Sequence, residues 1–555
     1  MKRWLSFILC AVGGLVLLLC GLLVPVHLRA VDVKVIERAG KKSHSMVEDG
    51  FAMLNQKQPG PVEQLLRVAK MEGLPGNEQL ELALRQFAKS YPELLVWGGT
   101  DFYLEKLFPN QASAPSSGSQ PFVEFVIQAE NRERLLEFLD SSGASEVRSL
   151  LQCRTLTTTT LFSPAQSAAG QPWEAALALS GLLLHEHRLK PSLHAALASM
   201  AAEAIRGGNS QRLEQTLLDL LSLGQRFNWL QLVAFVSQIE DVETLRRLAY
   251  LAQKAEARLP VLFSAVYLSG NPPAVARYLT EFSQSGWDDL GAGLRFGFGG
   301  LKELLERRQP IYLSHLRNEV VQYDPFGAFF SLLLDYCWLT PWVAISLKWF
   351  FYLAGGFLLA LAMHFARPAV SALERPLQVP GFHLAREFLF ALGFLLVVLL
   401  LSEPFLAQES QKVDFLPFRL RLPMVGGLVP AGISRASSLF MTLSLLTLLL
   451  FFVLQALIYT ACLVKLAEIR RQAMASRIKL KLLENEDHLF DAGLYLGFVG
   501  TIISLILVSL GVIKPSLMAA YSSTSFGIIF VSVFKIFHLR PLRRKLLLET
   551  EAVAS

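Results

Sequence analysis

Residues Gly497–Leu505 read GFVGTIISL, and residues Ala520–Gly527 read AYSSTSFG. Each stretch lies in an apolar run, and in each one small or hydroxyl residues recur at offsets 0, 3, 4 and 7, which is one face of a helix. These residues are Gly497, Gly500, Thr501 and Ser504 in the first run and Ala520, Ser523, Thr524 and Gly527 in the second. In lipid, close backbone approach and hydroxyl hydrogen bonds bring helices together. The stretch from about Asp491 to Lys535 therefore predicts two membrane helices with a polar seam.

The two motifs resemble those of the MotA/TolQ/ExbB proton-channel family. That family carries Gly-Leu-Leu-Gly-Thr-Val-x-Gly on one helix and Ala-Leu-x-Thr-Thr-x-x-Gly on the next. The matching residues are Gly497, Gly500 and Thr501 in the first motif and Ala520, Thr524 and Gly527 in the second, while Ser504 and Ser523 replace one residue of each. The resemblance covers about the last quarter of the chain.

The resemblance implies a proton-channel subunit that assembles as a homo-oligomer, a pentamer in the family. It also implies a single-span partner resembling MotB, TolR or ExbD, which would supply the proton-carrying carboxylate. The eight seam residues are then expected to line the pore or to pack helices, and no cofactor is expected. The chain departs from the family at Ala519, where some members carry glutamate, and at Ser532-Val533, where many carry a proline. Because of these departures, the resemblance supports the fold of the family more firmly than its proton chemistry.

The composition is that of a membrane protein with a large soluble part. Hydrophobic residues make up 52% of the 555-residue chain and charged residues 18%, whereas soluble proteins have about 25% charged residues. The net charge is +6, and no basic patch interleaved with aromatic residues indicates a nucleic-acid partner. The five cysteines form no CxxC pair, so the sequence predicts no disulfide framework.

Six apolar runs are long enough to predict membrane spans. They are Trp4–Val26, Trp342–Phe365, Phe388–Leu401, Leu439–Val464, Ala492–Gly511 and Leu517–Phe537, of which the third is short unless Ala385–Phe405 is counted. The first is interpreted as an uncleaved anchor rather than a signal peptide, because the run is long and His27–Ala30 is a poor cleavage site. Lys348 lies near the outer end of the second span, and we expect its side chain to snorkel to the interface.

The distribution of basic residues predicts the orientation, because cytoplasmic segments are enriched in Lys and Arg. These residues lie at Lys2 and Arg3, at Arg367 and Arg375, from Lys465 to Lys481, and from Lys535 to Lys545. All four groups fall on one side of a six-span topology. Both termini are then cytoplasmic, residues 31–340 are extracytoplasmic, and the membrane is the inner membrane of a bacterial cell.

Five regions follow from these runs. They are an anchor at 1–30, a mixed α/β region at 31–170, a helical-hairpin region at 171–340, two spans with an outer loop at 341–435, and a three-span channel module with a basic tail at 436–555. In the α/β region, Phe122–Ile127 and Thr155–Phe162 are predicted as strands, and Gln111–Gln120 as a linker.

The helical-hairpin region is predicted to resemble an α-solenoid, with a compact bundle as the alternative. Its expected helices are Trp173–Leu184, Pro191–Ile205, Ser210–Leu223, Trp229–Ile239, Val242–Ala255, Pro260–Leu268 and Pro273–Phe282. The predicted fold is mainly α: a polytopic helical membrane protein with six spans and a large extracytoplasmic, solenoid-like helical domain.

Few other residues indicate chemistry. Asp491 stands at the inner mouth of the fifth span, where the helix dipole already favours an acid. His185, His187 and His194 are interpreted as surface-helix residues rather than metal ligands, since HxH spacing suits a strand better than a helix. The chain has no Walker loop, no Gly-x-Ser-x-Gly and no zinc-protease helix, so we expect no enzyme.

Two functions remain open. The leading hypothesis is an ion-channel or energiser subunit that couples proton flow to a partner through its extracytoplasmic helical domain, which can itself bind a periplasmic protein. The alternative is a non-conducting membrane scaffold, in which the seam only packs helices and the helical domain binds proteins.

Overall fold

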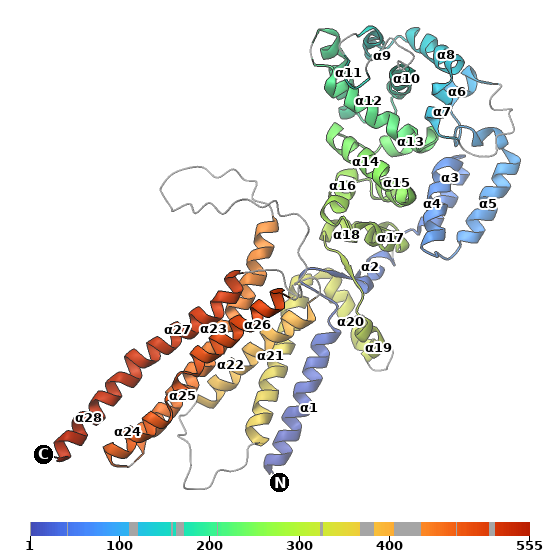
Figure 1. Ribbon diagram of the computed structural model, residues 1–555. Helices are drawn as coiled ribbons and strands as arrows, with labels where there is room; N and C mark the ends of the chain where they lie inside the picture. The colour runs from blue at the N-terminus through green and yellow to red at the C-terminus, as the bar shows by residue number, and fades with distance from the viewer. Residues whose placement is uncertain are drawn as a thin grey trace. The chain divides into compact units, whose positions relative to one another are not determined.

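The computed structural model describes residues 2–41, 43–109, 120–156, 159–162, 171–207, 209–321, 326–366, 382–403, 435–472, 474–509 and 517–554. In these residues the chain is mainly helical (Figure 1). It divides into two compact units. We call Met1–Asp32 with Tyr312–Ser555 the apolar unit, and Val33–Ile311 the stacked unit.

The apolar unit contains most of the long helices. Its elements are α1 (Lys2–Leu23), β1 (Val31–Asp32), α19 (His315–Val321), α20 (Phe326–Leu339), α21 (Pro341–Ala366), α22 (Phe382–Ser402), α23 (Arg435–Arg471), α24 (Ser476–Asn485), α25 (Asp487–Phe490), α26 (Ala492–Ser509), α27 (Leu517–Phe534), a π-helical turn (Lys535–Leu539) and α28 (Arg540–Ala554). Each of the six predicted spans falls on one of these helices. The short strand β2 (Ile311–Tyr312) pairs with β1.

Within the described residues, four helical segments are long and apolar enough to cross a membrane. They are Arg3–Leu23, Pro341–Ala366, Leu448–Arg471 and Tyr521–Glu551. Two shorter apolar segments are Gly327–Leu339 and Ala492–Ile502. The membrane character of the chain is therefore supported, while the count of six spans stays a prediction.

Small residues allow the helices of the apolar unit to pack closely. α1 packs against α21, α21 against α22, α22 against α23, α23 against α27, and α27 against α26. At the α1–α21 contact, a Cβ added at Gly14 would lie 3.0 Å from the Gly355 carbonyl oxygen, and one added at Gly355 would lie 3.0 Å from the Gly14 carbonyl oxygen. Such mutual backbone contact is the packing that small residues permit in lipid.

The stacked unit consists of shorter helices. They are α2 (Val33–Gly40), α3 (Met46–Asn55), α4 (Pro59–Met71), α5 (Asn77–Ser90), α6 (Phe102–Leu107), α7 (Phe122–Ile127), α8 (Ala129–Asp140), α9 (Ser145–Gln152), α10 (Gln171–His185), α11 (Pro191–Ile205), α12 (Gln211–Gly224), α13 (Trp229–Val236), α14 (Val242–Lys254), α15 (Leu259–Ser269), α16 (Pro272–Glu281), α17 (Gly286–Arg295) and α18 (Gly297–Arg307), with 3-10 turns at Pro92–Leu95, Cys153–Thr155 and Glu256–Arg258.

Local sequence explains several of these helix ends. Ser45 with Glu48 forms a capping box at the start of α3, and Asn228 with Gln231 forms one at α13. Each box satisfies backbone N–H groups that the first helical turn leaves unpaired. α15 ends at Gly270, whose φ of 57° is the left-handed conformation that glycine adopts at helix C-termini.

The helices of the stacked unit pack in series. α10 contacts α12, α12 contacts α14, and α14 contacts α16. The buried side chains between them are mostly leucine, phenylalanine and alanine. The seven helices predicted between Trp173 and Phe282 are confirmed, with ends that differ by at most a few residues. The solenoid assignment stays a prediction.

Two predictions about this region are wrong. Phe122–Ile127 is helix α7 rather than a strand, because Phe122, Val123, Phe125 and Val126 are buried together on one helical face. The described part of Thr155–Phe162 is a 3-10 end followed by turns.

The boundary between the two units differs from the predicted one. Residues after Ile311 belong to the apolar unit, including α20, whereas the predicted soluble region extended to residue 340.

Several predictions lie outside the described residues. These are most of the Gln111–Gln120 linker, the loop that follows Glu403, the connection that contains Arg367 and Arg375, and Gly511.

The α1–α21 contact gives a first test. We expect Gly14→Ala to destabilise the apolar unit by about 1–3 kcal/mol, because the added methyl group meets the Gly355 backbone. Gly13→Ala is the matched control, since its Cβ would meet only the tip of Leu358, at 3.4 Å. Equilibrium unfolding of the full chain in mixed detergent micelles measures both. Equal stability of the two variants would contradict the described packing.

Glu186 gives a pH-dependent test in the stacked unit. Burial, with the nearby charge of Asp101, raises the pKa of Glu186 to about 8, although Arg188 pairs with it at 2.8 Å. The unfolded chain releases this proton near the ordinary glutamate pKa of 4.5, so stability falls as pH rises from there to about 8. We expect Glu186→Gln to flatten this loss in thermal unfolding of the full chain. A variant with the same pH slope as the parent protein would refute the assignment.

Candidate functional site

The predicted seam is an interface between α26 and α27. A Cβ added at Gly497 would lie 2.8 Å from the Ser523 carbonyl oxygen, and one added at Gly527 would lie 2.7 Å from the Gly493 carbonyl oxygen. A Cβ at Gly500 would collide with the Ser523 hydroxyl. The glycines therefore allow the two helices to touch backbone to backbone, and Ser523 is buried between them.

Two threonines make a small hydrogen-bond network at this interface. Thr501 Oγ1 lies 2.5 Å from Thr524 Oγ1. The Gly497 carbonyl oxygen accepts from Thr501 Oγ1 at 3.1 Å and from Thr524 Oγ1 at 3.2 Å. Two hydroxyls carry two hydrogens, so only two of these three contacts can be hydrogen bonds at one time. The network can therefore exchange its donors without moving a helix.

The structure brings together six of the eight predicted seam residues through described contacts. They are Gly497, Gly500, Thr501, Ser523, Thr524 and Gly527. Ser504 lies in α26 and Ala520 in α27, as predicted, but their side chains are outside the described set. Helical spacing alone identified the small-residue face of each helix, and the structure shows that the two faces meet.

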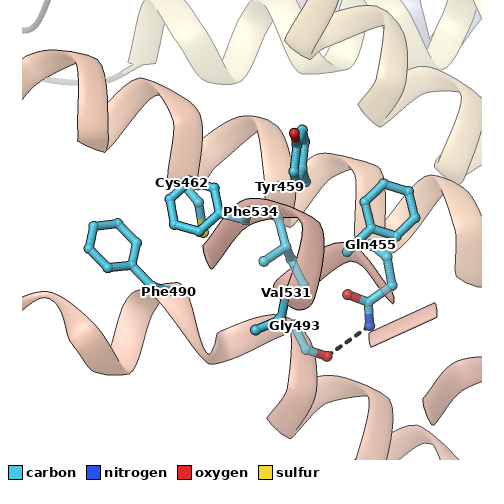
Figure 2. A pocket seen from close by; sticks show the side chains of 9 residues that line it. Gln455, Tyr459, Cys462, Phe490, Gly493, Val531 and Phe534 are labelled. Atoms are coloured by element: carbon cyan, nitrogen blue, oxygen red, sulfur yellow. Dashed lines mark hydrogen bonds between the residues drawn. The ribbon is translucent and has the colours of Figure 1, made fainter. Parts of the chain in front are cut away.

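A third helix contributes a polar side chain that the sequence analysis missed. Gln455 of α23 is 1% exposed, and its Nε2 donates to the Gly493 carbonyl oxygen at 2.9 Å (Figure 2). Its Oε1 has no hydrogen-bond partner. The amide borders a cavity with about 10 Å³ of room for water centres, close to the least that one water molecule needs. A lone glutamine in the apolar run Leu448–Arg471 was the available signal.

Charged pairs lie at the end of this three-helix module where α26 begins. Asp491 pairs with Lys535 at 2.7 Å, and Asp487 pairs with Arg543 at 2.9 Å. The Tyr459 hydroxyl lies 2.9 Å from His538 Nε2. Asp491 thus has a cationic partner in addition to the helix dipole that the sequence analysis invoked.

A second cluster of polar groups lies where α1, α21 and α22 end or begin. Lys348 Nζ donates to Glu403 Oε1 at 2.6 Å and to the Val26 carbonyl oxygen at 2.8 Å. Glu403 Oε2 accepts from the Leu28 backbone N–H at 2.8 Å. Lys348 is 1% exposed and Glu403 is 5% exposed. The pair therefore joins three segments that are far apart in sequence.

The expectation that Lys348 snorkels is wrong. Its ammonium points into the protein, because Glu403 and the Val26 carbonyl offer partners there that apolar surroundings do not. Burying a charge costs several kcal/mol unless it is paired. The signal in the sequence was an acid at the end of one apolar run and a base inside another, but nothing in the sequence showed that they meet.

His27 completes this cluster, together with an ion pair between Arg317 and Asp32. His27 Nδ1 lies 3.4 Å from Lys348 Nζ and 3.7 Å from Glu403 Oε2. Burial, and then the positive charges of Lys348 and Arg317, lower the pKa of His27 to about 4 against the opposing effect of Glu403. His27 is therefore neutral at pH 7. Arg317 and Asp32 are both buried.

The three histidines that were not predicted to be metal ligands contact other side chains. His185 Nδ1 lies 2.9 Å from Ser142 Oγ, and its ring packs between Tyr103 and Phe138. The His187 ring stacks on the His194 ring. Among the described side chains, no group of three or more His, Cys, Asp or Glu is placed to hold a metal ion.

Comparison with known proteins adds no relative: no family model, no curated protein and no solved structure matches this chain.

The buried pair predicts a large asymmetry between single and double variants. Glu403→Ala leaves the Lys348 ammonium buried without its counter-charge, and we expect it to cost about 3–5 kcal/mol. Glu403→Leu combined with Lys348→Met removes both charges and restores most of that stability. Equilibrium unfolding of the full chain in detergent measures the three free energies. A double variant that is as unstable as Glu403→Ala, or less stable, would show that the two side chains do not act as a pair.

Proposed function

We propose that this chain is a proton-conducting subunit of a membrane energiser resembling MotA, TolQ and ExbB. The observation that carries the proposal is the contact between Thr501 and Thr524, which lie on consecutive apolar helices at the positions of the two family motifs. Hydroxyls that exchange donors can order water or accept a hydrogen bond from a carboxylic acid. No acid is needed on α26 or α27 if a single-span partner supplies it.

The neighbouring polar groups extend this network along the module. Gln455 reaches the Gly493 carbonyl one helical turn from Gly497, and Asp491 with Lys535 lies at the start of α26. Polar groups at these levels give water and protons a sequence of partners in an otherwise apolar bundle. A charge inside a membrane is costly, and a hydroxyl and amide path avoids that cost until the partner's carboxylate is in place.

The arrangement in the cell follows from charge and from the family. The basic residues of α23 and α28 favour a cytoplasmic location for that end of the module. The chain would then lie in a bacterial inner membrane with the stacked unit in the periplasm. There the helices of the stacked unit offer a surface to a protein partner. A homo-oligomer around the single-span partner, pentameric as in the family, would place several seams around one axis.

A scaffold without conduction is the second candidate. Thr501 and Thr524 satisfy each other and the Gly497 carbonyl within the chain. A seam that is satisfied in this way is sufficient to hold α26 against α27, and it leaves the stacked unit as the part that acts.

Valine substitutions separate the two functions, because valine keeps the shape of threonine and lacks the hydroxyl. We expect Thr501→Val and Thr524→Val each to lower proton flux at least tenfold in membrane vesicles that contain the chain with its native partners. Flux is read from an interior pH dye under an imposed membrane potential. Unchanged flux in both variants at equal protein level would favour the scaffold.

Ser525→Ala is the matched control. Ser525 lies on α27 next to Thr524, but its side chain is exposed and bonds only the Tyr521 carbonyl of its own helix. This variant should conduct like the parent protein. A tenfold loss in Ser525→Ala would show that flux responds to any hydroxyl removed from α27.

A further inference from the structure

The cluster of Lys348, Glu403 and His27 lies on helices other than those of the seam. Lys348 belongs to α21, Glu403 follows α22, and His27 follows α1. Four residues after Leu28 the chain reaches Asp32, where the first segment of the apolar unit ends, and continues into α2 of the stacked unit. Whatever holds Val26–Leu28 therefore also holds the start of the connection between the units.

One hydrogen bond of this segment, from Lys348 Nζ to the Val26 carbonyl, depends on the protonation state of His27 through their shared contact with Lys348. With neutral His27, Nδ1 can accept from Lys348 Nζ at 3.4 Å, so the ring hydrogen lies on Nε2. Nε2 is buried without a hydrogen-bond partner, and the side chain is 6% exposed. In this tautomer the Nε2–H group is unsatisfied, and Nδ1 accepts the hydrogen bond from Lys348.

Adding a proton to His27 changes this arrangement. Nδ1–H would then face the Lys348 ammonium, and two cations would compete for the single carboxylate of Glu403, which already lies 3.7 Å from Nδ1. The site would carry one positive charge more than it can pair. Relief requires Lys348 to withdraw, and its bond to the Val26 carbonyl is lost with it.

Among the described residues, no other group close to the ring removes this conflict. The groups that act on the ring are Lys348 of α21, Glu403 after α22, Arg317 of α19, which pairs with Asp32 of β1, and the Tyr312 ring of β2. Of these, Glu403 is the anion in direct reach of His27, since Asp32 already has Arg317. The site can therefore pair either Lys348 or protonated His27 with Glu403, but not both fully.

We propose that His27, Lys348 and Glu403 form a proton-binding site, separate from the threonine seam, in which binding of a proton to His27 exchanges the partner of Glu403 and releases the Val26 carbonyl from Lys348 of α21. The ligand is a proton, and the readout is the order of the segment that leads to the stacked unit. The proposal does not depend on conduction through the seam.

Hydrogen–deuterium exchange of the full chain in lipid nanodiscs tests this directly. Rates for backbone amides of residues 26–32, corrected for the intrinsic effect of pH, are compared at pH 7.5 and pH 4. We expect exchange at least tenfold faster at pH 4, while α3 in the same sample keeps its protection. Corrected rates that agree within twofold at the two pH values would overturn the proposal.

His27→Asn is the decisive variant, because its amide oxygen can accept from Lys348 near the position of Nδ1 and does not bind a proton in this range. We expect its residues 26–32 to exchange slowly at both pH values, within twofold of the parent protein at pH 7.5. A variant that still loosens tenfold at pH 4 would assign the pH response to another group and refute the role of His27.

Lys348→Met distinguishes partner exchange from a purely structural ion pair. Without the ammonium, protonated His27 becomes the natural partner of Glu403, so the segment should be loose at pH 7.5 and at least tenfold better protected near pH 5. A structural pair predicts a segment that stays loose at both values. That second result would overturn the exchange of partners, whether or not the seam conducts protons.

Discussion

The apolar unit depends on one constraint: a charge removed from water must find its counter-charge inside the protein. Lys348 and Glu403 meet this constraint together, at 2.6 Å, and the backbone at Val26 and Leu28 fills their remaining hydrogen-bonding positions. The pair fixes the ends of α1, α21 and α22 relative to one another. Further along the same helices, α1 and α21 also make the close backbone contact of Gly14 with Gly355.

The second half of the apolar unit uses a different solution. Between α26 and α27 no charge is buried among the described side chains, and glycine contacts with shared hydroxyl hydrogens hold the helices. Neutral hydroxyls cost less to bury than ions, and they can reverse their donors at little cost. The unit therefore combines a fixed, ionic part with a part whose hydrogen bonds can rearrange. We propose the ionic part as a proton-binding site and the part with hydroxyl hydrogen bonds as the path for protons.

Sequence reasoning worked where a pattern is local. Helices from Trp173 to Phe282 follow from their spacing and breaks, and the seam follows from residues 3, 4 and 7 apart. It failed at Phe122–Ile127, where a six-residue apolar run fits both periods and packing of α7 against α8, α10 and α12 decides for the helix. It also missed Gln455 and misread Lys348, since a single polar residue in an apolar run has no spacing from which a partner can be inferred.

The sequence by itself determined that the chain is mainly helical, that it is rich in apolar helices, and which face of α26 and which face of α27 carries small and hydroxyl residues. Hydrophobic and small-residue periodicity encodes these features within one or two turns. Only the tertiary structure decided that Lys348, Glu403 and His27 meet. Their separation along the chain, 55 residues between the ion-paired side chains and 321 between Lys348 and His27, is bridged by helix packing, and no local pattern records it.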